Sequence, residues 1–96
     1  MPYIHKDERY KYNNLINALA DILNTRKDND ELSGELNYVF FRLSRLLTDQ
    51  ESGGERSYAR MAIVTSALTG ACSEFRRRVM SPYEDEKIGL NGDVEL

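Results

Sequence analysis

One histidine and one cysteine, His5 and Cys72, are the only residues of their types in the sequence. A general base or a metal ligand needs partner side chains at a suitable spacing, and none surrounds His5. Cys72 lies among apolar residues at helical spacing, without the basic neighbours or helix N-terminus that stabilise a reactive thiolate. We therefore expect His5 at the surface or capping a helix, Cys72 packed in the core, and no catalytic residues.

Acidic residues could serve magnesium and nucleotide chemistry if pairs of them faced each other from two helices. Glu31 and Glu35 are four residues apart, but the other long helix that we expect carries Glu74 alone. The glycine pair at 53–54 is followed by Glu55, where a phosphate-binding loop needs a lysine. The sequence therefore predicts no metal site, no cofactor and no cofactor-binding residues.

A basic cluster, Arg76–Arg78, is followed closely by the acidic run Glu84–Glu86. One interpretation is structural, because cations complement the dipole at a helix C-terminus and can pair with the acids that follow. The other interpretation is functional, and its candidate cluster consists of Arg77, Arg78, Tyr83, Glu84, Asp85 and Lys87. The protein would then be a small nucleotide- or metal-handling enzyme, or a nucleic-acid accessory protein that binds through Arg76–Arg78.

Length, composition and charge help to decide between these interpretations of the charged cluster. Ninety-six residues make one small domain, and 41% apolar with 30% charged residues is typical of a globular chain. The net charge is −3, and residues 82–96 carry five acids against Lys87. Nucleic-acid binders normally carry a basic field, so a nucleic-acid partner is not expected. No run reaches the ~18 apolar residues of a membrane span, and the N-terminus does not resemble a signal peptide, so we expect a cytoplasmic protein without a membrane partner.

Apolar residues recur at intervals of three and four, which predicts an all-α, three-helix bundle. The expected helices span about 7–24, 33–48 and 57–80. Polar residues after the first and a glycine-containing stretch after the second separate them. Asp30 or Ser33 should cap the second helix and Ser57 the third. The third helix should end before Ser81-Pro82, because proline disfavours helix in the residue before it.

Two of these helices carry more apolar surface than one packing partner covers. The run Tyr38–Phe41 sweeps about 300° around a helix axis, and helix 57–80 has a bulky stripe and a second stripe of small residues. A self-contained bundle needs about one stripe per helix, so the excess predicts a homodimer, whose interface resembles a core cut in two. The residues that we predict for this interface are Tyr38, Phe41, Ile63, Ala67 and Gly70.

Residues 82–96 are interpreted as an acidic C-terminal extension of a three-helix domain at 1–81. Apolar residues of the extension alternate with acids, and Asn91-Gly92 is a turn signal. Because the third helix is the longest, its C-terminal end would otherwise be bare. We therefore expect Tyr83 and Ile88 to fold back onto that helix, or the extension to dock on a partner.

Several short strings in the sequence resemble those of a small uncharacterised protein family of phage and prokaryotic genomes, including archaeal ones. The strings are Met1-Pro2-Tyr3-Ile4, Gly34–Val39, Ser57-Tyr58, Glu74-Phe75, Arg77-Arg78, Pro82–Ile88 and Asn91–Val94. The family pattern has an aromatic residue at the position of Arg76. The resemblance implies a helical protein of about this length and no particular activity.

These features together favour a non-catalytic helical interaction module. We expect it to be a homodimer in the cytoplasm of a microbe or its phage, with an unidentified protein as a further partner. The enzyme and nucleic-acid interpretations of the charged cluster are the alternatives.

Overall fold

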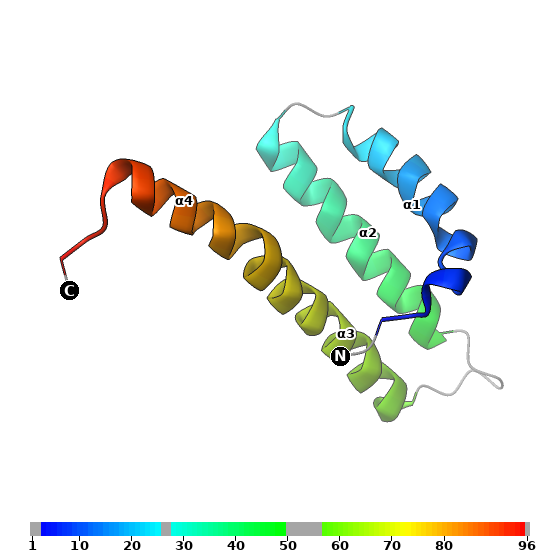
Figure 1. Ribbon diagram of the computed structural model, residues 1–96. Coiled ribbons are helices and arrows are strands. Elements are labelled where there is room, and N and C mark those ends of the chain that lie inside the picture. Colours follow the sequence, from blue (N-terminus) through cyan, green and yellow to red (C-terminus); the bar gives the residue numbers. More distant parts are fainter. Residues whose placement is uncertain (1–2, 26–27, 50–56, 96) are drawn as a thin grey trace. The chain divides into compact units, whose positions relative to one another are not determined.

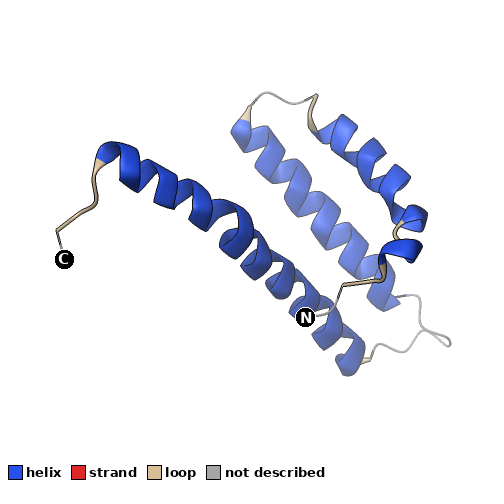
Figure 2. Cartoon of the chain, viewed as in Figure 1, coloured by secondary structure: helices blue, strands red, loops and turns tan. Residues whose placement is uncertain are grey.

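The computed structural model describes residues 3–25, 28–49 and 57–95 (Figure 1). Every regular element in these ranges is helical, which confirms the predicted all-α, three-helix fold (Figure 2). The predicted separators are 25–30 and 49–55, and residues 26–27 and 50–55 of them lie outside the described residues. The chain divides into two compact units, Met1–Glu55 and Arg56–Leu96.

The first unit begins with the short 3-10 helix η1 (Lys6–Glu8), which leads into α1 (Tyr10–Leu23). His5 caps η1, because its Nδ1 accepts a hydrogen bond of 3.3 Å from the backbone N–H of Asp7. The side chain of His5 is exposed, so the predicted surface or capping role is confirmed. Helix α1 carries its apolar residues along one side, with a spacing of three and four.

Helix α2 (Asn29–Asp49) begins four residues before the predicted start. The Oδ1 atom of Asp28 accepts a hydrogen bond of 2.7 Å from the backbone N–H of Asp30, and its carbonyl accepts from the N–H of Leu32 at 3.0 Å. Asp28 therefore caps the helix in place of the predicted Asp30 or Ser33, which lie inside the first turns. An earlier aspartate that meets the free amides extends a helix at its N-terminus, and Gly34 is tolerated within it.

Helices α1 and α2 lie side by side in the first unit, joined at the end where α1 finishes (Figure 1). Leu23, Leu36 and Val39 are half-buried. Thr48 is the single buried residue in the described part of the chain, and its hydroxyl donates to the carbonyl of Ser44 within α2 at 3.0 Å. The apolar side chains that the structure describes are therefore covered only in part.

The second unit is one continuous helical run made of α3 (Tyr58–Phe75), the π-helical turn η3 (Arg76–Met80) and α4 (Ser81–Asn91) (Figures 1 and 2). Ser57 caps α3 as predicted, with its Oγ accepting from the backbone N–H of Arg60 at 3.3 Å.

The predicted end of this helix near residue 80 is wrong, because the helix continues through Pro82 to Asn91. A proline inside an α-helix lacks a donor, and its ring clashes with the carbonyl four residues earlier. The π turn relieves this conflict, since the N–H of Ser81 bonds to the carbonyl of Arg76, five residues back. Pro82 then occupies the first turn of α4, a position that suits its fixed backbone angle.

The expectation that Tyr83 and Ile88 fold back onto the third helix is also wrong within this unit. Both residues belong to α4, which prolongs the helix, and both side chains are exposed. The helix ends at Gly92, which has a φ of 86° and donates its N–H to the carbonyl of Ile88 at 2.8 Å. A positive φ is a conformation that glycine adopts at little cost, so the turn signal Asn91-Gly92 acts as a helix stop.

Alanine substitutions at two glycines of this region are expected to have opposite effects. Gly89 lies within α4 with open space where a methyl group would be added, so Gly89→Ala should stabilise the helix by about 1 kcal/mol. Gly92 also has open space but a positive φ, so Gly92→Ala should destabilise the helix end by about 1 kcal/mol. Hydrogen exchange of the α4 amides measures both, and a change of the same sign in the two variants contradicts this account.

Candidate functional site

The charged cluster predicted from the sequence lies on the surface of the second unit. Arg77 and Arg78 belong to η3, and the other members, Tyr83, Glu84, Asp85 and Lys87, belong to α4. All six side chains are exposed. Because successive residues of a helix point about 100° apart, neighbours in this sequence diverge around the axis and do not enclose a substrate-sized cavity.

The side-chain contacts of this cluster lie within the helical run itself. The Nη2 atom of Arg77 forms an ion pair of 2.8 Å with Oε2 of Glu74, one turn earlier. The ammonium of Lys87 lies 5.6 Å from the centre of the Tyr83 ring, a cation–π distance. The structure therefore brings Tyr83 and Lys87 together, whereas Arg77 turns towards Glu74 and away from the acids at 84–86.

The remaining charges of this region have no ion pair with any described residue. They are Arg76, Arg78, Glu84, Asp85 and Glu86. Arg76 and Glu84 stand eight residues apart, whereas ion pairs along one helix form at spacings of three or four. The region thus holds two groups of opposite charge that cannot neutralise each other within the same helix.

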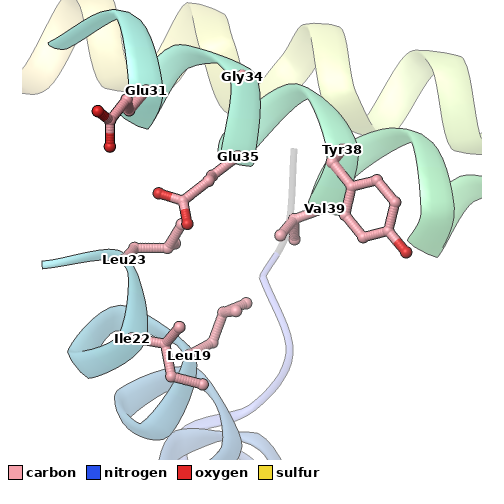
Figure 3. Close-up of a pocket in the computed structure, with 8 residues that line it drawn as sticks. All are labelled: Leu19, Ile22, Leu23, Glu31, Gly34, Glu35, Tyr38 and Val39. Atoms are coloured by element: carbon pink, nitrogen blue, oxygen red, sulfur yellow. The ribbon is translucent and has the colours of Figure 1, made fainter. Parts of the chain in front are cut away.

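A pocket lies between the two helices of the first unit, with a volume of about 640 Å³ (Figure 3). Leu19, Ile22 and Leu23 line it from α1, and Glu31, Gly34, Glu35, Tyr38 and Val39 line it from α2. The Oε2 atom of Glu35 is shielded from solvent, and its carboxylate points from α2 towards the end of α1 (Figure 3). The pocket can therefore accept an apolar group, with carboxylates on one side.

Sequence reasoning missed most of this pocket, because it did not consider Glu31 and Glu35 as neighbours of the apolar residues of α1. The signal that could have found it is the recurrence of Glu31, Glu35 and Val39 at intervals of four, which puts them on one face of α2. Among the described residues no group of three or more acids, histidines or cysteines is placed to hold a metal ion.

The five residues predicted for a dimer interface belong to both units. Tyr38 and Phe41 in α2 are each 67% exposed, and Ile63 in α3 is 68% exposed. Ala67 is exposed and Gly70 is half-buried. Each unit therefore presents a part of the predicted interface to its surroundings, and the dimer itself stays a prediction.

Cys72 is exposed, which corrects its predicted place in a core. The apolar stripe of α3 that contains it belongs to a unit made of one helical run, and a single helix has no second element against which to bury a stripe. None of the described helices is both long enough and apolar enough to cross a lipid bilayer.

Comparison with known proteins identifies the chain at the level of a family. The family described as Domain of unknown function (DUF6899) matches residues 1–94, almost the whole sequence. No curated protein and no solved structure matches the chain. The matched span includes both helical units and the charged region of α4, so the chain belongs to the DUF6899 family of domains of unknown function.

Proposed function

We propose that this domain is a non-catalytic interaction module that acts as a homodimer. The observation that carries the proposal is the exposure of large apolar side chains along the second unit. Phe75, Val79, Tyr83 and Leu90 are each more than half exposed on one helical run. A long helix draws most of its stability from the packing of an apolar face, so this run needs a partner surface.

The arrangement of the titratable residues supports a binding role over catalysis. The cluster at Arg77, Glu84, Asp85 and Lys87 lies along an exposed helix, whereas acid–base or metal chemistry benefits from convergent groups in a water-shielded cavity. His5 caps η1 through its ring nitrogen, on a different unit. Surface charges on a helix are suited to select a partner and to orient it.

The proposal extends to the source and the cellular place of the protein. The strings at 34–39, 82–88 and 91–94 support an origin in a phage or a prokaryote, including archaea. The composition and the lack of a spanning helix in the described residues support the cytoplasm as the site of action.

Sedimentation equilibrium of the full chain at micromolar concentration tests the proposal. The expected result is a mass of about twice the 11.1 kDa of one chain. A mass of one chain over the whole micromolar range would overturn the homodimer. Thermal unfolding with and without Mg²⁺, Mn²⁺ and nucleotides is the companion measurement, and a marked stabilisation by any of them would favour the enzyme alternative.

A further inference from the structure

The second unit carries a stripe whose spacing is the same when read from either end. Its members are Cys72, Phe75, Val79, Tyr83, Lys87 and Leu90, which follow one another at intervals of three, four, four, four and three. All six side chains are exposed on the run α3–η3–α4. We refer to these six residues as the 72–90 stripe. Intervals of three and four join neighbours along one side of an α-helix, and the intervals of four on either side of Val79 also suit the wider π turn at Arg76–Met80, so the stripe follows one side of the run.

The centre of the 72–90 stripe is Ser81, between Val79 and Tyr83. A two-fold axis at this point would pair the stripe with the stripe of an antiparallel copy at matching positions, with the π turn of one helix opposite the α-helical residues 82–86 of the other. Such an isologous contact pairs residue i with residue j and residue j with residue i. The two-fold pairing about Ser81 places Val79 opposite Tyr83 of the partner subunit. It also places Phe75 opposite the partner's Lys87, and Cys72 opposite the partner's Leu90.

The charges that flank the stripe follow the same symmetry. Arg76 and Glu84 each come one position after a stripe residue, and therefore lie on the same side of it. Arg78 and Glu86 each come one position before a stripe residue, and lie on the opposite side. In an antiparallel pair each side of one helix meets the same side of the other, so every arginine of the flanks meets a glutamate.

This symmetry explains why these flanking charges lack ion pairs in the described structure. Arg76 and Glu84 are eight residues apart along the helix, too far to pair within one chain. Arg77, which lies away from the stripe, has its own partner in Glu74 at 2.8 Å. A parallel pair in register would instead bring arginines beside arginines and acids beside acids, which is unfavourable.

The length of the run also suits a second copy of the same helix. The run from Tyr58 to Asn91 is about 50 Å long at ~1.5 Å per residue. A second copy of the same run matches the stripe in length, spacing and charge.

We propose that the α3–η3–α4 helix pairs antiparallel with the same helix of a second copy, about a two-fold axis at Ser81. The inference deepens the proposed homodimer and rests on it. The 72–90 stripe forms the centre of the interface. Arg76 and Arg78 bind Glu84 and Glu86 of the partner subunit on its two sides. Lys87 lies against the partner's Phe75 with its apolar stem, as long cationic side chains commonly do.

Disulfide cross-linking of the full chain tests the antiparallel register. Leu90→Cys adds a second thiol opposite Cys72 of the partner. Cα atoms 4.4–6.8 Å apart can be bridged, and facing positions of two helices packed with axes about 8–10 Å apart come within reach of that range. Oxidation should then give a covalent dimer on a non-reducing gel. Within one helix, residues 72 and 90 are about 27 Å apart and cannot be linked.

Two controls accompany this experiment. Ile88→Cys adds a thiol two residues away, off the stripe, and should give little covalent dimer. The unaltered chain should also stay uncross-linked, because its two copies of Cys72 lie at opposite ends of an antiparallel interface. Cross-linking of the unaltered chain through Cys72, or equal yields from Leu90→Cys and Ile88→Cys, would overturn the proposed register.

Charge reversal tests the flanking ion pairs independently. Arg76→Glu with Arg78→Glu makes both flanks acidic, and Glu84→Lys with Glu86→Lys makes both basic. Each double variant alone should dimerise at least ten-fold more weakly, because like charges then face each other. An equimolar mixture of the two should restore dimers, now composed of one copy of each, as mass analysis of the complex would show.

The matched control is Lys6→Glu with Arg42→Glu, which changes the net charge by the same amount and leaves the flanks intact. It should dimerise like the unaltered chain. Failure of the mixture to form mixed dimers would overturn the proposed pairing. A chain that dimerises by sedimentation without cross-linking through Leu90→Cys would overturn this interface and leave the homodimer standing, whereas a monomeric chain would overturn both.

Discussion

Replacement of Phe75 and Val79 together by serine is expected to dissociate the proposed dimer. The two side chains are 58% and 52% exposed on the helix; Val79 lies next to the centre of the 72–90 stripe, and Phe75 is the next stripe residue outward. Burial of such a side chain contributes about 1.5–3 kcal/mol, and two-fold symmetry counts each of them twice. The dissociation constant measured by sedimentation equilibrium should therefore rise about a hundred-fold or more.

The control for this experiment removes comparable apolar surface from the other unit. Tyr10→Ser with Leu15→Ser changes two side chains of α1 that are 69% and 71% exposed. This variant should dimerise like the unaltered chain. If it dissociates the dimer and the Phe75/Val79 variant does not, the dimer interface lies on the first unit and the stripe has another role.

The substitution Val39→Asp is expected to lower the free energy of unfolding of the first unit by about 2–3 kcal/mol. Val39 is half-buried on α2 and lines the same pocket as Leu19, Ile22 and Leu23 of α1. The new carboxylate would lose part of its hydration among these side chains, and it would stand one turn from the like charge of Glu35. Urea unfolding followed by circular dichroism measures the loss.

Asn37→Asp is the matched control, because it adds the same charge to the same helix at an exposed position. Its effect should stay within about 0.5 kcal/mol, as is usual for surface substitutions. Equal destabilisation by the two variants would show that charge anywhere on α2 is harmful, and would contradict the packing of Val39 against α1.

The helices themselves could be predicted from the sequence, because their signals are local. Apolar spacing marks all three helical runs, and Ser57 is recognisable as the cap of α3 from its position alone. Asn91-Gly92 is recognisable as a turn, and Gly92 supplies the positive φ that ends α4. Each of these features depends on hydrogen bonds between residues at most five positions apart.

The errors in the predicted helix boundaries also have local causes, namely a π turn and an earlier helix cap. Pro82 is a common helix stop, but the π turn at Arg76–Met80 lets the helix pass it. Asp28 caps α2 earlier than Asp30 or Ser33 would. At both helix boundaries two backbone conformations are compatible with the same residues. Sequence rules predict the conformation that is more common in proteins.

The sequence by itself determined the helical class, the Ser57 cap of α3 and the period of the apolar stripes in this DUF6899 domain. Only the tertiary structure decided which stripes meet, and therefore that α1 and α2 enclose a pocket whereas Cys72 stays exposed. The physical reason is that a helix forms through bonds within about one turn. The burial of its faces depends on side chains that are distant in sequence or belong to another element.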